Sequence, residues 1–183
     1  MMTKNIHSIQ EKSIAFIGFM GVGKTTIAQK VASKLFRDFV DIDEEIEKEF
    51  GMPTTDIFKQ YGEAFFREKE KEYVIHYCQQ PLKVISLGGG AFLQEEVKEA
   101  CLKHSIVIYL DMSWEAWIER LPLLIDSRPI LQSKSLDEIQ ALFESRKKIY
   151  EQHDSKVVTD NASPEDIANT IIDSMKLAWE LHS

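Results

Sequence analysis

The 183-residue chain is poor in cysteine: Cys78 and Cys101 are its only two, and they lie far apart without forming a C-x-x-C pair. We therefore expect neither a disulfide framework nor a cysteine metal site. The five histidines show no spacing typical of metal ligands. Positive charge is also scarce, with 22 lysines and arginines against 30 aspartates and glutamates. The resulting net charge of −8 argues against a nucleic-acid partner, which would require a basic surface.

Long apolar runs are absent as well. No stretch approaches the length of a membrane span, so no membrane partner is expected. Residues 14–22 form an apolar run after Lys12, but no small-residue cleavage site follows, which argues against a signal peptide. We expect a cytoplasmic protein with a flexible leader at residues 1–12 and a single domain over residues 13–183.

The most informative feature that is present lies at residues 18–25, which read Gly-Phe-Met-Gly-Val-Gly-Lys-Thr and fit the P-loop pattern G-x-x-x-x-G-K-[ST]. An apolar strand-like stretch precedes this P-loop, and helical spacing follows it. In this context Lys24 is expected to reach the β- and γ-phosphates of a nucleotide, and the Thr25 hydroxyl to ligate Mg²⁺. An ordinary glycine turn between a strand and a helix is the alternative.

Strand-like segments alternate with helix-like segments along the chain. Such alternation predicts an α/β fold of three layers, in which helices cover both faces of a parallel sheet of about five strands. The strands are expected at residues 13–17, 39–43, 83–87, 106–110 and 156–159. Residues 122–134 contain two prolines and little periodicity, which predicts a loop. Along the second expected strand, alternation would place Asp41 and Asp43 on the same face.

Several separated motifs, in the right order over about residues 13–160, resemble the shikimate kinase family of nucleoside-monophosphate-kinase-like P-loop kinases. Besides the P-loop they are the D-x-D pair at residues 41–43, the helix stretch with Phe66, Arg67 and Glu70, the glycine turn at residues 88–90, Arg128-Pro129-Ile130-Leu131, and Arg146 with Tyr150. That family phosphorylates the 3-hydroxyl of shikimate with ATP and Mg²⁺, on the route to chorismate. The resemblance implies a small helical substrate-binding part at about residues 42–80 and a lid at about residues 122–134.

The resemblance also implies a role for each matching residue. ATP would be bound by the P-loop, the following threonine and two arginines: Gly21, Val22, Gly23, Lys24, Thr25, Thr26, Arg120 and Arg128. Shikimate would be bound by Asp43, Arg67, Gly88, Gly89, Gly90 and Arg146. Mg²⁺ would be held by Thr25 and Asp41. The catalytic residues would be Lys24, Asp43 and Arg128.

Physical chemistry makes these roles reasonable. Asp43 would hydrogen-bond the substrate hydroxyls and is the best candidate to accept the hydroxyl proton. Arg67 and Arg146 would grip the shikimate carboxylate, because a planar guanidinium can donate two parallel hydrogen bonds to it. Arg128 would stabilise charge on the phosphoryl group in the transition state. The expected partners are ATP and shikimate, and we expect a monomer.

Some of these residues also have a purely structural interpretation. Asp41 and Asp43 could be solvated acids at the start of a helix, where carboxylates are favoured. Arg67 could be one more charge on a highly charged helix. Trp114 and Trp117 are interpreted as packing residues. For the whole chain, the alternatives are a gluconate-type sugar-acid kinase and a non-catalytic nucleotide-binding regulator.

Overall fold

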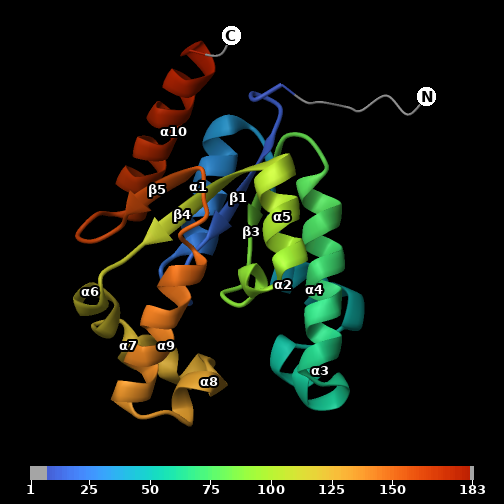
Figure 1. Ribbon diagram of the computed structural model, residues 1–183, viewed down its shortest axis with the longest axis vertical. Helices are drawn as coiled ribbons and strands as arrows, with labels where there is room; N and C mark the ends of the chain where they lie inside the picture. Colours follow the sequence, from blue (N-terminus) through green and yellow to red (C-terminus); the bar gives the residue numbers. More distant parts are fainter. Residues whose placement is uncertain (1–7, 182–183) are drawn as a thin grey trace.

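The structure is a computed structural model that describes residues 8–181 of the chain (Figure 1). In this part of the chain five strands form one sheet in the order β2-β3-β1-β4-β5, and every neighbouring pair is parallel. The strands are β1 (Ser13–Ile17), β2 (Asp38–Asp41), β3 (Lys83–Ser86), β4 (Ser105–Asp111) and β5 (Ser155–Val158). The prediction of a five-stranded parallel sheet is therefore confirmed.

The central strand β1 leads into the P-loop. All of its residues are buried, and Ile14 lies in register with Val84 of β3 on one side and Ile106 of β4 on the other. A strand that is covered on both faces needs apolar side chains on both, which explains why its sequence shows no alternation. The P-loop consequently begins at the middle of the carboxyl edge of the sheet, where ligands of such folds gather.

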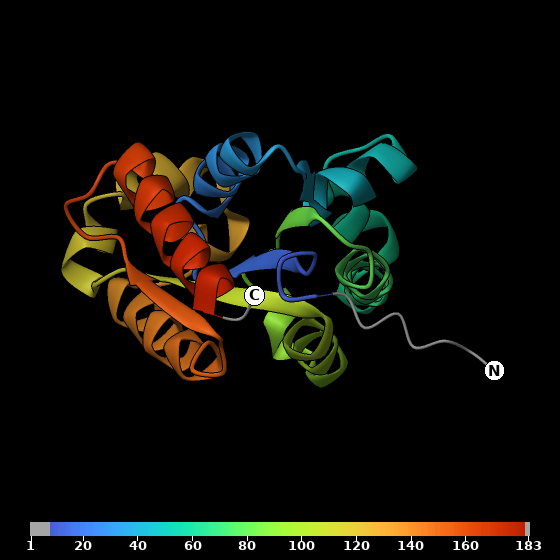
Figure 2. The ribbon, with the colours of Figure 1, turned by 90° about the horizontal axis from the view of Figure 1, so that it is seen from above.

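Helices cover both faces of the sheet. On one face, α1 (Lys24–Leu35) packs against α10 (Pro164–Leu181). On the other face lies α5 (Glu95–His104), which packs against α4 (Glu63–Cys78). Seen from above, α1 and α10 lie on one side of the strands and α5 on the other (Figure 2). This arrangement confirms the predicted three-layer α/β fold.

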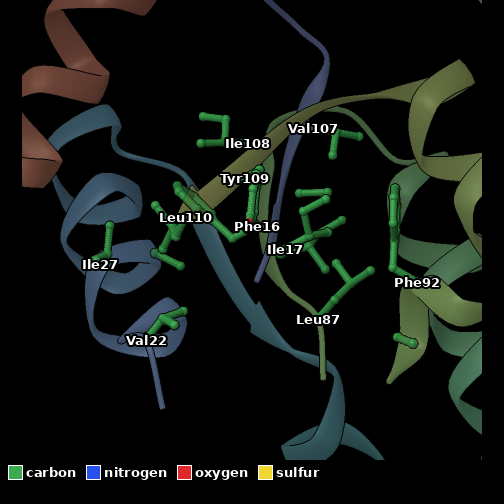
Figure 3. Packing of buried hydrophobic residues seen from close by; sticks show 14 of the residues in the cluster. Phe16, Ile17, Val22, Ile27, Leu87, Phe92, Val107, Ile108, Tyr109 and Leu110 are labelled. Atoms are coloured by element: carbon green, nitrogen blue, oxygen red, sulfur yellow. The ribbon is translucent and has the colours of Figure 1, made fainter. Parts of the chain in front are cut away.

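The core forms where the apolar stripes of these helices meet the strands. Ile27 of α1 and Phe92, just before α5, are almost completely buried on opposite sides of the central strand residues Phe16 and Ile17 (Figure 3). The helical spacing of apolar residues in the sequence therefore corresponds to real buried faces.

The remaining helices gather near the carboxyl edge of the sheet. Figure 1 shows α3 on one side of this edge and α7 with α8 on the other, far from the end of α10. These elements are α2 (Ile42–Phe50), α3 (Thr54–Tyr61), α6 (Trp114–Ile118), α7 (Leu121–Leu124), α8 (Pro129–Gln132) and α9 (Leu136–Ile149), with the 3-10 turns η1 (Ala91–Leu93) and η2 (Ile125–Ser127).

Two local predictions are wrong. The second strand ends at Asp41, whose side chain accepts a hydrogen bond of 3.1 Å from the Glu44 backbone N–H and so caps α2. Asp43 therefore lies in the first turn of a helix, and strand alternation does not relate it to Asp41. The expected loop at residues 122–134 contains α7, η2 and α8, because Pro122 and Pro129 occupy first-turn positions, where proline is tolerated in a helix.

The beginning of the chain is described only in part. The expected flexible leader covers residues 1–12, of which residues 1–7 lie outside the described residues. Further along, the guanidinium of Arg37 donates a hydrogen bond of 2.8 Å to the Lys12 carbonyl, and the Leu82 N–H donates one of 2.8 Å to the Glu11 carbonyl. None of the helices between residues 8 and 181 has the length and apolar character that crossing a membrane requires.

Candidate active site

A cavity of about 240 Å³ opens at the carboxyl edge of the sheet. Its walls come from the P-loop, the junction of β2 with α2, the turn after β3, and the lid segment. Ten of the residues that we predicted for the site line it: Gly21, Gly23, Lys24, Thr25, Thr26, Asp41, Asp43, Gly88, Gly89 and Arg128. Four segments that are distant in sequence therefore meet around one space.

The P-loop wraps the amino-terminal end of α1. Gly21 and Gly23 have φ values of 78° and 96°, a left-handed conformation that residues with a Cβ rarely adopt. Gly23 is the residue that precedes the first turn of α1, so the loop amides and the positive end of the helix dipole lie together. This combination makes an anion-binding site.

Lys24 is buried, and its ammonium group is held by the P-loop itself. Its Nζ donates hydrogen bonds of 2.7 Å to the Gly18 carbonyl and 2.9 Å to the Phe19 carbonyl. Burial, helped by the nearby charge of Arg128, lowers the pKa of Lys24 to about 8. The group therefore remains mostly protonated at neutral pH and available to a polyphosphate.

Thr25 and Asp41 form an oxygen pair beside this loop. The Thr25 hydroxyl donates a hydrogen bond of 2.9 Å to Oδ2 of Asp41, and the Ser86 hydroxyl oxygen lies 3.5 Å from that of Thr25. Mg²⁺ prefers oxygen ligands and is usually held by one or two carboxylates together with phosphates and waters. These donors fit such an ion. Residues 8–181 hold no group of three or more His, Cys, Asp and Glu side chains that could bind a metal, so phosphate and water oxygens would complete the coordination.

Asp43 presents a carboxylate of unusual basicity to the cavity. Burial, reinforced by the charge of Asp41, raises the pKa of Asp43 to about 6, although Arg128 and Lys24 act in the opposite direction. Its Oδ1 is buried and has no hydrogen-bond partner among the described residues. A Cβ added at Gly88 would lie 3.1 Å from that oxygen, so the glycine lets the turn pack closely against the carboxylate.

Arg67 lies against the glycine turn at Gly90. Its NH1 donates a hydrogen bond of 2.8 Å to Oε1 of Glu70, which is fully buried one helical turn along α4. Burial raises the pKa of Glu70 to about 7, while the charge of Arg67 opposes that shift. A Cβ added at Gly90 would lie 2.6 Å from NH2 of Arg67, so the absence of a side chain at Gly90 leaves space for the guanidinium.

Gln94 is a neighbour of this pair that the sequence analysis missed. Its side-chain amide donates a hydrogen bond of 3.1 Å to the same Glu70 oxygen that accepts from Arg67. Gln94 lies at the start of α5, four residues after Gly90. Nothing in its local sequence distinguishes it from an ordinary helix-start residue, so only the fold reveals its position.

Arg146 reaches the same region from α9. Its guanidinium is half buried, and one nitrogen, NH1, is fully buried without a hydrogen-bond partner among the described residues. Burial lowers the pKa of Arg146, and the nearby positive charge of Arg67 contributes in the same direction. Two guanidinium groups that act on each other in this way suit an anionic group of a ligand.

Five residues predicted to bind ATP or substrate do not line the cavity directly: Arg67 and Arg146, described above, and Val22, Arg120 and Gly90. The Val22 side chain is buried in the core. Arg120 donates a hydrogen bond of 3.0 Å to the Gly21 carbonyl and so lies beside the P-loop. Gly90 adjoins Arg67, as described above.

Trp117 and Tyr150 also touch the loops of the site. The Trp117 Nε1–H donates a hydrogen bond of 2.8 Å to the Met20 carbonyl in the P-loop. The Tyr150 hydroxyl donates one of 2.6 Å to the Gly89 carbonyl in the glycine turn. The sequence indicates only a packing role for Trp117, and no sequence signal predicts its contact with the P-loop. Tyr150 belongs to a family motif, but that motif gave it no role.

Comparisons with known proteins agree with this picture. A family model described as shikimate kinase matches residues 20–176. The shikimate kinase of Oceanobacillus iheyensis is 58% identical over 174 residues, which cover 95% of each chain. That of Bacillus subtilis is 51% identical over 183 residues, covering 100% of this chain and 98% of its own. A solved structure, shikimate kinase from Acinetobacter baumannii in complex with shikimate, has a TM-score of 0.84 at 29% identity, covering 92% of this chain and 94% of that one.

A P-loop at the carboxyl edge of a parallel sheet, facing an acidic residue and a lid arginine across one cavity, defines a small P-loop kinase. The family model and the curated relatives identify the family within this class. The chain belongs to the shikimate kinase family. The gluconate-type and non-catalytic alternatives find no support in these matches.

Proposed function

We propose that this chain transfers the γ-phosphoryl group of ATP to the 3-hydroxyl of shikimate and releases ADP and shikimate 3-phosphate. The hydroxyl oxygen forms a bond to the γ-phosphorus, and the bond from that phosphorus to the oxygen bridging the β-phosphate breaks. The hydroxyl proton goes to the carboxylate of Asp43. The raised pKa of Asp43, about 6, suits a general base that works near neutral pH.

The nucleotide half of the cavity would bind its ligand mainly through backbone amides. The amides of Gly21, Val22 and Gly23 would bind the phosphates, and Thr26 would continue this contact along the first turn of α1. Lys24 would exchange its hydrogen bonds to the Gly18 and Phe19 carbonyls for bonds to the β- and γ-phosphates. Its buried ammonium would then stabilise charge that develops on the transferred group.

Mg²⁺ is the cofactor that we propose, held by Thr25 directly and by Asp41 directly or through water. When bound, the ion would neutralise negative charge on the phosphates. The hydrogen bond between Thr25 and Asp41 prepares the pair, because it fixes the hydroxyl oxygen beside the carboxylate before the ion arrives. Arg120, which lies beside Gly21, would contact the adenine end of ATP.

The acceptor half would act mainly through side chains. Arg67 and Arg146 would bind the shikimate carboxylate, and Glu70 would keep the Arg67 guanidinium in place. Asp43 would accept hydrogen bonds from the ring hydroxyls. Gly88, Gly89 and Gly90 would let the ring approach the backbone, since no Cβ intervenes.

Arg128 would complete the site from the lid. It is exposed but lines the cavity beside Lys24 and Asp43, the two residues whose pKa values it affects. A guanidinium there would stabilise the charge of the phosphoryl group during its transfer. The lid would exclude the water that could otherwise hydrolyse ATP.

The observation that carries this proposal is the shared cavity of Lys24, Asp43 and Arg128. A coupled assay that measures ADP release with shikimate, with gluconate or with no acceptor would test it. We expect release to depend on shikimate. Turnover with gluconate alone would support a sugar-acid kinase, and nucleotide binding without turnover on either acceptor would support a regulator.

The assembly state and location are parts of the same proposal. The cavity is built entirely from one chain, so a monomer would suffice for activity. A sedimentation experiment at assay concentration would test this. The cytoplasmic location expected from the sequence stays a prediction.

A further inference from the structure

The lid is flanked by two elements that also hold the two ligand loops. It contains α7, η2 and α8, with α6 before it and α9 after it, and Figure 1 shows α6, α7, α8 and α9 as one group. Trp117 belongs to α6, and Tyr150 directly follows α9. Trp117 donates to the Met20 carbonyl of the P-loop, and Tyr150 to the Gly89 carbonyl of the glycine turn.

Both donors are deeply buried and firmly placed. The exposed fraction is 0% for Trp117 and 1% for Tyr150. Trp117 lies in an aromatic cluster with Phe19 of the P-loop and Phe143 of α9, with ring centroids 5.2 and 5.8 Å away. Burial raises the pKa of Tyr150 well above its usual range, so its hydroxyl keeps the proton that it donates. Such groups can fix a loop because they have little freedom themselves.

The two carbonyls that they hold belong to backbones in contact. A Cβ added at Gly89 would lie 3.4 Å from the backbone nitrogen of Met20. In a trans peptide the C=O of one residue and the N–H of the next point in opposite directions. When a donor outside the cavity binds such a carbonyl, the N–H of the next residue therefore points away from that donor. The amides concerned are those of Gly21 and Gly90.

These two amides are available to ligands. Among the hydrogen bonds of residues 8–181, none has the Gly21 or Gly90 N–H as its donor to another protein group. Gly21 lines the cavity, and Gly90 faces the guanidinium of Arg67. One amide therefore adjoins the phosphate-binding loop and the other adjoins the region proposed for the acceptor carboxylate.

We propose that Trp117 and Tyr150 are a pair of positioning residues, which act from the two flanks of the lid and orient the Gly21 amide toward the nucleotide and the Gly90 amide toward the acceptor. Neither side chain touches a substrate. This inference rests on the proposed function for its acceptor half. Its nucleotide half depends only on phosphate binding by the P-loop.

The test is a crossed pair of substitutions. Trp117→Phe removes the indole donor but keeps an aromatic ring, and Tyr150→Phe removes only the hydroxyl. We expect Trp117→Phe to raise the KM for ATP about tenfold with the KM for shikimate nearly unchanged, and Tyr150→Phe to do the reverse. A merely structural role would lower activity without this split. Equal effects of each variant on both KM values, or no effect, would overturn the proposal.

Matched controls are available in the same clusters. The Trp114 ring stacks on that of Trp117 at 5.5 Å, and the Tyr109 ring lies 5.4 Å from that of Tyr150. The Tyr109 hydroxyl donates to Asp111 instead of a ligand loop, at 2.9 Å. Trp114→Phe and Tyr109→Phe should therefore leave both KM values close to those of the unmodified protein. A KM split in these controls would count against the assignment.

A measurement on the unmodified protein keeps the inference testable if either variant fails to fold. The chain has eight glycines, so selective ¹⁵N-glycine labelling gives a simple spectrum. We expect ADP to shift the Gly21 resonance and shikimate to shift that of Gly90. A Gly21 resonance insensitive to ADP would overturn the nucleotide half. If the protein shows no shikimate-dependent ADP release at all, the proposed function fails, whereas the ADP response still decides whether the Gly21 amide faces the nucleotide.

Discussion

Most of the nucleotide half of the cavity comes from one continuous stretch of eight residues, the P-loop at 18–25, whereas the acceptor half is assembled from α2, α4, the glycine turn and α9. The first half binds through backbone amides and needs little besides glycines and one lysine. The second half depends on side chains such as Asp43, Arg67 and Arg146, which only the fold brings together. A phosphate site can therefore be recognised from local sequence, and an acceptor site cannot.

The two halves also differ in the direction in which burial shifts the pKa values of their charged groups. On the nucleotide side, burial lowers the pKa of Lys24 to about 8, and on the acceptor side it raises those of Asp43 and Glu70 to about 6 and about 7. In all three cases desolvation is the largest cause, and it disfavours the charged form. The protein thus brings the pKa values of these three groups close to neutral pH before any ligand binds. Changes in each half should have separable effects.

The largest expected effect comes from the nucleotide half. Lys24→Ala should lower kcat about 10³-fold, because it removes a buried cation that faces the transferred phosphoryl group. Steady-state ADP release at saturating ATP and shikimate would measure this. Lys30→Ala, on the same helix but paired with Glu165 at the surface, should leave kcat unchanged. If Lys24→Ala kept most of the activity, phosphate binding by this loop would not drive the reaction.

Asp43→Asn should lower kcat about 10²-fold, because the amide cannot accept the hydroxyl proton. In the unmodified enzyme, protonation of Asp43 should make kcat/KM fall as the pH drops below its pKa of about 6. The Asn variant should lose this acid limb. A pH profile of both proteins between pH 5 and about 8 would show it. An identical acid limb in the two proteins would assign the titration to another group.

Arg67→Ala should raise the KM for shikimate about 50-fold while the KM for ATP changes little, because it removes a charge-assisted contact from the acceptor half alone. Lys69→Ala, two residues along the same helix, removes a surface charge and serves as the control. Unchanged shikimate binding in Arg67→Ala would refute the carboxylate-binding role.

Gly90→Ala should raise the KM for shikimate by about tenfold without changing any charge. The new Cβ would lie 2.6 Å from NH2 of Arg67 and would push the guanidinium aside. Initial rates over a range of shikimate concentrations would measure the change. A larger effect on ATP than on shikimate would mean that the glycine turn belongs to the nucleotide half.

The last expected effect is on stability and not on catalysis. The ionised form of Asp43 is disfavoured in the folded protein, so its charge destabilises the fold above pH 6 and has no such effect below about pH 4. Asp43→Asn should therefore raise the free energy of unfolding by up to about 3 kcal/mol at pH 8, and by almost nothing at pH 4. Urea unfolding at the two pH values would measure this. A variant less stable than the parent at pH 8 would contradict the raised pKa.

The sequence predicted the fold and the position of the P-loop well, because both follow from local patterns. The apolar run of β1, the P-loop and the helical spacing after it are contiguous, so their meaning does not depend on distant residues. The bounds of the second strand were wrong, since Asp41 serves as a helix cap and Asp43 begins the helix. Strand periodicity cannot foresee where a cap ends the strand.

The acceptor half, and the contact of Trp117 with the P-loop, lay largely beyond local reasoning. Arg67 resembled any other charge on α4 until the family motif singled it out, and Trp117 looked like a packing residue. Their contacts with Glu70 and with the Met20 carbonyl arise from elements separated in sequence. Only long-range packing decides such pairs, and a single sequence does not encode it in any local pattern.

The most direct test of the central claim is a crystal structure of the protein with Mg²⁺, ADP and shikimate bound together. The account predicts that the ADP phosphates lie in the P-loop, that the shikimate carboxylate lies between Arg67 and Arg146, and that its 3-hydroxyl lies within hydrogen-bond distance of Asp43. Shikimate bound with its carboxylate away from both arginines, or with its 3-hydroxyl facing away from Asp43 and the phosphates, would contradict it.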